Sequence, residues 1–105
     1  MRFPSEIIRK DIEARLRAYL SRDRTGVRRE LLALFIRIKS LTIPQIYEAL
    51  HRRFSISYHS VASMVGIIAS RLGILRASKN PEGTNMLYEL REKYVEMVRQ
   101  IVRTT

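Results

Sequence analysis

Basic side chains dominate the chemistry that this sequence can perform. The chain carries 20 lysine and arginine residues against 10 aspartate and glutamate residues, so its formal net charge is +10. A basic field of this size concentrates polyanions near the protein and displaces their counterions on contact. Nucleic acid is therefore the natural class of partner, although a basic protein without such a partner would have the same composition.

The other polar side chains indicate no catalytic or metal-binding set. The sequence has no cysteine, and its two histidines, His51 and His59, fall on different predicted helices. A metal site needs three or four converging ligands. Nor is there a glycine-rich phosphate loop, a usefully spaced carboxylate pair or a Ser-His-acid arrangement. We expect no metal, no cofactor and no enzymatic activity.

Size and hydropathy are typical of one small globular domain. The 105 residues are 46% hydrophobic, which suits a single core. No apolar run is long enough to cross a bilayer, and Ser5, Glu6 and Arg9 interrupt any apolar segment typical of a signal peptide. We therefore expect one domain over residues 1–105, a cytoplasmic location and no membrane partner.

A helix is expected at each end of the chain. Residues 5–22, with Ser5 as N-cap, and residues 91–103 both carry apolar stripes at helical spacing. These stripes either complete the core of a monomer or pair with a second copy in a two-fold dimer. We favour a homodimer, with these candidate interface residues: Ile8, Ile12, Leu16, Tyr94, Val98 and Ile101.

Between the terminal helices, residues 25–90 predict three helices followed by a β-hairpin. A helix with a broad apolar face over residues 25–39 precedes one with a clear start, where Thr42 and Gln45 form a capping box. Pro44 is tolerated in that first turn, because its missing N–H has no helical partner there.

The third of these helices is expected over residues 58–72, with Ser57 as its N-cap. Gly73 should end it in a left-handed conformation. After Gly73 the pattern changes to two short strands, residues 74–79 and 85–90, joined by a turn-forming loop.

The side of helix 58–72 opposite its apolar stripe carries small polar residues. Serine and histidine can donate or accept hydrogen bonds. The first two turns hold no arginine, lysine, asparagine or glutamine, the side chains that make bidentate contacts to guanine and adenine. The face holds His59, Ser63, Gly66 and Ser70, with Ser60 at one edge.

From Arg28, the run RRELLALFIRIKSLTIPQIYEAL and then SVASMVGIIASRLGIL resembles the winged helix-turn-helix of bacterial and archaeal transcription regulators. The likeness is closest to the DNA-binding half of ferric-uptake regulators, looser to the MarR class, and extends to a small uncharacterised archaeal family. It covers about residues 25–90. The implied fold is mainly α (α+β), a winged helix-turn-helix with a C-terminal β-hairpin wing and extra N- and C-terminal helices. Metal sensing is not carried over, because clusters of histidine, cysteine and carboxylate ligands are missing.

The resemblance implies that helix 58–72 enters the DNA major groove and that the wing, residues 74–90, contacts the backbone. We therefore expect a transcriptional regulator that binds duplex DNA as a homodimer. The alternative is a winged-helix RNA-binding or protein–protein interaction module without sequence-specific DNA binding. The base-facing candidates are His59, Ser60 and Ser63, and the phosphate-contact candidates are Arg52, Arg53, Arg71, Arg76 and Lys79.

Overall fold

The computed structural model describes residues 4–105, with side chains described from residue 7 onward. This part of the chain is mainly helical and contains one antiparallel β-hairpin, which confirms the predicted fold class. In chain order the elements are α1 (Pro4–Ser21), α2 (Val27–Arg37), α3 (Ile43–His51), α4 (Tyr58–Ile67), the π-helical η1 (Ile68–Leu72), β1 (Leu75–Lys79), β2 (Met86–Leu90), the 3-10 helix η2 (Glu92–Tyr94) and α5 (Val95–Thr104).

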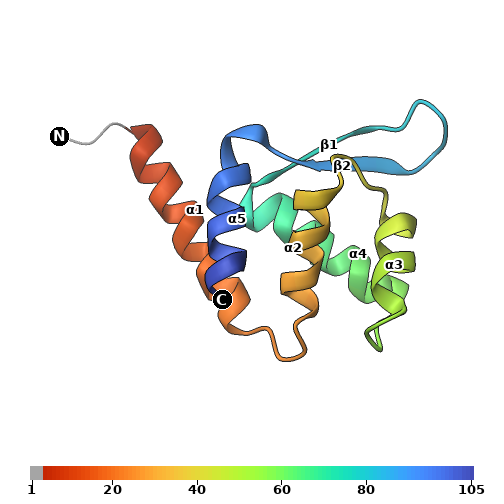
Figure 1. Cartoon of the computed structure of the whole chain (residues 1–105). Helices are drawn as coiled ribbons and strands as arrows, with labels where there is room; N and C mark the ends of the chain where they lie inside the picture. The colour runs from red at the N-terminus through yellow and green to blue at the C-terminus, as the bar shows by residue number, and fades with distance from the viewer. Residues whose placement is uncertain (1–3) are drawn as a thin grey trace.

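The elements are arranged so that the terminal helices and the helix-turn-helix lie at opposite ends. Figure 1 shows α1 beside α5 at one end, α2 in the middle, and α3 with the start of α4 at the other end. The hairpin crosses above the helices and its tip projects beyond α3 (Figure 1). No helix within residues 4–105 is long and apolar enough to span a membrane.

The core is built from apolar stripes that face one another across these helices. A surface helix is stabilised mainly by burying such a stripe against its neighbours. The α2 helix contributes residues from more than one side, as its broad apolar face predicts. The largest fully buried side chains are Leu16, Leu31, Leu32, Ile46, Leu50, Ile68, Ile74, Ile101, Val61, Val65 and Val98.

The terminal helices use most of their predicted dimer surface inside this core. Five of the six candidate interface residues are buried in a single chain, whereas Ile8 is 55% exposed. A side chain buried in its own core offers no surface to a partner, so the interface assignment of these five is corrected. They are Ile12, Leu16, Tyr94, Val98 and Ile101.

The helix starts follow local hydrogen-bonding rules that were visible in the sequence. The Thr42 hydroxyl accepts from the Gln45 N–H at 3.3 Å, and the Gln45 side chain accepts from the Thr42 N–H at 2.8 Å. The predicted capping box is thus confirmed. Ser57 accepts from the N–H of Ser60 at the start of α4, and Gly73 ends the helix with φ 68°.

Several boundaries differ from the prediction for identifiable reasons. The α2 helix begins after Gly26, whose φ is 87°, rather than at residue 25. The carboxylate of Asp23 accepts from the backbone N–H groups of Arg28 and Arg29 at 3.1 and 3.0 Å, so it caps α2 from outside. The α1 helix already includes Pro4, one residue before the predicted start. The predicted cap, the side chain of Ser5, lies outside the described side chains.

The hairpin is tied to the helices by a third short extended segment. β1 and β2 pair in antiparallel register from Leu75 opposite Leu90 to Lys79 opposite Met86. Leu41 forms an isolated bridge with Tyr88, with N–H···O distances of 2.9 and 2.8 Å. Leu41 directly precedes the cap of α3, so the bridge fixes the hairpin relative to the helix-turn-helix.

Candidate nucleic-acid interface

The three base-facing candidates lie exposed on the first two turns of α4. The Ser60 hydroxyl accepts a hydrogen bond from the Ser57 hydroxyl at 3.0 Å, so it can still donate to a ligand. Within the described residues, the side chains of His59 and Ser63 have no hydrogen-bond partner in the chain, and both are exposed. These two side chains are therefore free to donate to or accept from a ligand.

Gly66, on the next turn of the same face, has no structural need to be glycine. Apart from the local helix backbone, a Cβ atom at this position would meet no described atom within 4 Å, and Gly66 is exposed. Its carbonyl oxygen accepts from the Ser70 hydroxyl at 2.7 Å. The backbone at Gly66 is therefore open to solvent on this face.

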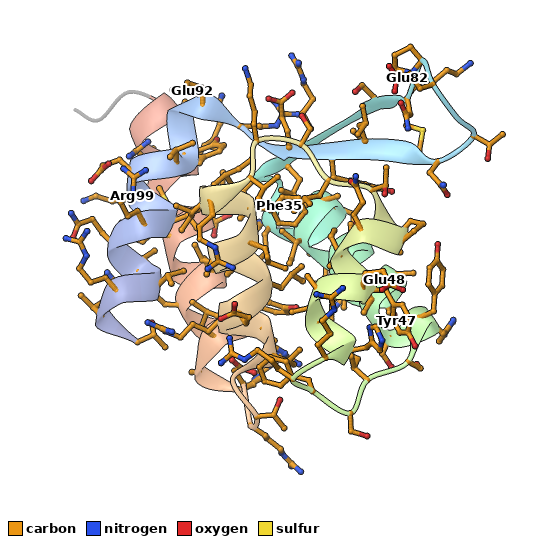
Figure 2. The ribbon with its side chains drawn as sticks, turned by 45° about the vertical axis from the view of Figure 1, so that its right-hand side comes forward. Phe35, Tyr47, Glu48, Glu82, Glu92 and Arg99 are labelled. Atoms are coloured by element: carbon orange, nitrogen blue, oxygen red, sulfur yellow. The ribbon has the colours of Figure 1, made fainter. Side chains whose placement is uncertain are left out.

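Three aromatic rings meet beside this face, at the junction of α3 and α4. Tyr47 and His51 are stacked, with ring centroids 4.7 Å apart and an interplanar angle of 8°. Tyr58, the first residue of α4, meets the Tyr47 ring edge-on at 5.7 Å. Figure 2 shows Tyr47 on the same side of the molecule as the hairpin tip, marked by Glu82. We call these three residues the aromatic cluster.

The sequence alone indicates only one of the two ring contacts in the aromatic cluster. Tyr47 and His51 are four residues apart, which places two side chains of a helix side by side. Tyr58 joins them only because the turn between α3 and α4 brings its first residue alongside Tyr47. This contact depends on tertiary structure, so the sequence does not predict the complete cluster.

The two basic candidates on β1 do not share a surface. Side chains of a strand alternate between its faces, so Arg76 and Lys79, three residues apart, point to opposite sides of the hairpin. Arg76 pairs with Glu89 at 3.1 Å and lines a hollow with Lys39, Arg91 and Lys93. Lys79 is exposed near the hairpin tip, opposite Met86.

The two basic candidates that follow α3 lie at the turn of the helix-turn-helix. Arg52 is the C-cap of α3 and is exposed. Arg53 is exposed too, but its guanidinium lies 3.4 Å from a carboxylate oxygen of Glu30. Arg52 is thus the more available of the two for a phosphate group.

Arg71 lies on η1, at the far end of the helix from His59. It lines a pocket of about 480 Å³ between α1 and η1, together with Arg15, Arg22 and Arg28. The Arg28 guanidinium covers the ring of Tyr19 at 4.3 Å. The structure therefore brings Arg52, Arg53 and Lys79 to the end of the molecule that holds the aromatic cluster, and places Arg71 elsewhere.

Several arginines serve the fold rather than a ligand. Arg15, Arg28 and Arg29 each donate to a backbone carbonyl at or near the C-terminal end of another helix, at 3.0, 2.8 and 3.0 Å. Cations are favoured there by the helix dipole and by the carbonyls without helical partners. The net charge of +10 therefore overstates the charge available to a polyanion. In the part of the chain that the structure describes, no three potential metal ligands gather.

A protein-family model covers most of this arrangement. The family is described as protein of unknown function (DUF2551), and its model matches residues 16–98. The chain belongs to this family. An uncharacterized protein from Archaeoglobus fulgidus is 45% identical to this DUF2551 protein over 93 residues, which cover 88% of this chain and 93% of that one. This relative agrees with the predicted resemblance to an archaeal family.

Solved structures of MarR from E. coli are similar to the DUF2551 chain. A mutant MarR matches with a TM-score of 0.63 and 17% identity, covering 98% of this chain and 76% of that chain. The same mutant in complex with operator DNA matches with a TM-score of 0.62 and 18% identity, covering 93% of this chain and 68% of that chain. At this identity the likeness establishes the fold, so the winged helix-turn-helix with a MarR-like arrangement is confirmed.

Proposed function

We propose that this DUF2551 protein is a transcriptional regulator that binds duplex DNA as a homodimer through α4 and the hairpin. One observation carries the proposal. The outer face of α4 is exposed beside a projecting hairpin, in a fold shared with a MarR that was solved with operator DNA. In helix-turn-helix proteins, the second helix of the motif lies in the major groove.

The electrostatics of this end of the molecule support the same partner. Arg52 at the helix-turn-helix turn and Lys79 near the hairpin tip have no ion-pair partner among the described residues, and both are exposed. Contacts of this kind hold a protein on the phosphate backbone without specifying sequence. Each one adds to the counterion release that makes DNA binding sensitive to salt.

Residues at the start of α4 would make the contacts with the bases. The side chains of His59 and Ser63 have no hydrogen-bond partner among the described residues, and the Ser60 hydroxyl can still donate. Single hydrogen bonds of this kind discriminate less between bases than the bidentate contacts of arginine or asparagine do. We therefore propose modest sequence preference from polar groups and a large contribution from phosphate contacts.

The homodimer would use the apolar residues that the monomer leaves outside its core. Ile7 and Ile8 are 56% and 55% exposed on adjacent positions of α1. A two-fold dimer through α1 would place two α4 helices on half-sites about 34 Å apart, one turn of DNA. Ile8 therefore remains an interface candidate, and Ile7 joins it.

Binding to a random duplex pool tests the function. We expect selection to enrich a palindrome, and affinity to fall steeply between 50 and 200 mM salt. Removing a phosphate contact with Arg52→Ala or Lys79→Ala should lower the slope of log affinity against log salt by about 0.9 each. Arg17→Ala is the matched control, because among the described residues Arg17 pairs only with Glu13 on α1. No binding at 50 mM salt would contradict the proposal.

Sedimentation of Ile8→Glu tests the homodimer separately. A charge in a two-fold apolar contact is repeated in both copies and loses its solvation. The wild type should sediment as a dimer and the variant as a monomer with unchanged helical content. Ile38→Glu is the control, since Ile38 is 45% exposed at the end of α2, away from α1. A wild-type monomer at micromolar concentration would contradict the dimer.

A second candidate function is an RNA-binding or protein-interaction module on the same fold. The observation that favours it is the start of α4, which lacks arginine, lysine, asparagine and glutamine in its first two turns. Competition between duplex DNA and a structured RNA for the purified protein separates the two. A clear preference for RNA would replace the first proposal by the second.

A further inference from the structure

We infer that the aromatic cluster recognises thymine, through contact between Tyr58 and thymine methyl groups in the major groove. The inference deepens the proposed function and rests on it, because α4 must first lie against duplex DNA. It adds an apolar contact to the modest sequence preference that hydrogen bonds at the start of α4 supply.

The first support is the position of Tyr58. It is the first residue of α4, directly before His59 and after the N-cap Ser57. The N-terminal residues of a recognition helix are those that reach base edges. Tyr58 is 46% exposed, and it is the one aromatic residue among the large exposed apolar side chains of the described chain.

The second support is the rigidity that the cluster gives to Tyr58. Tyr47 holds the Tyr58 ring edge-on at 5.7 Å, and Tyr47 is itself stacked on His51 at 4.7 Å. A ring nitrogen of His51 lies 3.0 Å from the carbonyl oxygen of Tyr47. A ring held in place loses little conformational freedom on binding, so more of its contact energy appears as affinity.

The third support is the chemistry of the bases. In the major groove thymine presents a methyl group, and apolar side chains contact it favourably. Cytosine and uracil lack that methyl. The other route to specificity, a bidentate hydrogen bond, needs side chains that the first two turns of α4 do not contain. An aromatic surface at this place therefore favours thymine-containing sites.

The charged residue beside the aromatic cluster suits the same orientation of the protein on DNA. Arg52 follows His51 directly and is exposed, so it can contact phosphate while the cluster faces the groove. Phosphate contacts fix the register of a protein on the duplex. In that register Tyr58 would meet the same base step in each complex.

The test compares two duplexes that differ only in methyl groups. One consists of A·T pairs, and the other carries deoxyuridine in place of thymidine. The protein should bind the thymine duplex more tightly by about fourfold per contacted methyl, which corresponds to about 0.8 kcal/mol. Fluorescence anisotropy at 50 mM salt measures both affinities.

Variants then assign the difference to Tyr58. Tyr58→Ala should bring the ratio of the two affinities close to one, whereas Tyr58→Phe, which keeps the ring, should preserve it. Ile38→Ala removes an equally exposed apolar side chain outside the proposed interface and should also preserve it. Thermal unfolding checks that the variants fold, and a second variant, Tyr58→Ser, guards against an effect of alanine in the first turn.

The outcomes separate the inference from the function on which it rests. Equal binding of both duplexes by the wild type overturns the thymine contact and leaves duplex binding in place. A thymine preference that survives Tyr58→Ala overturns the role of Tyr58. Absence of binding to either duplex overturns both proposals. Tighter, Tyr58-dependent binding to single strands than to duplex also overturns the inference, because the ring would then stack on unpaired bases.

Discussion

The guanidinium of Arg15 on α1 donates to the backbone carbonyl oxygen of Arg71 at 3.0 Å, at the C-terminal end of the helix that carries the candidate base-facing residues. The carbonyls of a last helical turn have no partners within the helix. A positive group there also complements the helix dipole. The N-terminal helix thus holds one end of the helix-turn-helix.

Arg15→Met should therefore destabilise the fold by about 0.5–1.5 kcal/mol, the usual net contribution of such a hydrogen bond. Methionine keeps the apolar stem and removes the donor. Arg17→Met is a matched control on the same helix, because within the part of the chain that the structure describes Arg17 pairs only with Glu13 one turn away, a contact worth about 0.2–0.5 kcal/mol. Urea denaturation measures both. An equal effect of the two changes would show that the bond to Arg71 adds nothing.

Tyr19 carries a hydroxyl that is buried without a hydrogen-bond partner among the described residues. Leaving such a group unsatisfied costs about 1–3 kcal/mol. Tyr19→Phe removes the hydroxyl and keeps the ring under the guanidinium of Arg28. The variant should be as stable as the wild type or more stable by up to about 1 kcal/mol. A loss of stability in urea denaturation would mean that the hydroxyl has a favourable contact.

The same residue predicts a dependence on alkaline pH. Burial raises the pKa of Tyr19 above its ordinary 10.0, Arg28 lowers it and Asp23 raises it, with a net increase. The unfolded chain therefore loses this proton first. The stability linked to Tyr19 is complete below pH 10 and falls as the pH rises through the folded-state pKa. Subtracting the Tyr19→Phe profile from the wild-type profile between pH 8 and 11 isolates the effect. A flat difference would contradict the raised pKa.

The capping box predicts a cost for changing Thr42, which is buried at the start of α3. Thr42→Ala removes the acceptor for the Gln45 N–H and should destabilise the protein by about 0.5–2 kcal/mol. Thr42→Ser keeps the hydroxyl and should recover most of that loss. If serine and alanine destabilise alike, the loss comes from the packing of the threonine methyl rather than from the cap.

Local signals explain why so much of the fold could be predicted. The capping box of Thr42 and Gln45 spans four residues, and the left-handed stop at Gly73 involves one. Such features depend on nearby hydrogen bonds and backbone sterics, which the sequence displays directly. The π-helical turn from Ile68 to Leu72 has no comparable local signature.

Features that depend on which surfaces meet could not be predicted in the same way. The stripes that hold Ile12 and Val98 showed that one face of each terminal helix is buried, but not whether its own core or a second copy covers it. The structure buries both residues within one chain. The meeting of Tyr58 with Tyr47 likewise depends on the turn geometry. The separation of Arg76 and Lys79 is different, because strand alternation alone predicts it.

A substitution at Gly66 tests whether protein stability and affinity for DNA change in opposite directions. Apart from the local helix backbone, no described atom lies within 4 Å of the place where its Cβ would be, and alanine suits a helix better than glycine by about 0.5–1 kcal/mol. Gly66→Ala should therefore raise the melting temperature. If duplex DNA approaches the backbone at this turn, the added methyl should weaken DNA binding at the same time. Arg17→Ala, on α1 and outside the proposed interface, serves as the control for affinity. A more stable Gly66→Ala protein with unchanged affinity would show that DNA contacts α4 only nearer its start, around His59 and Ser63.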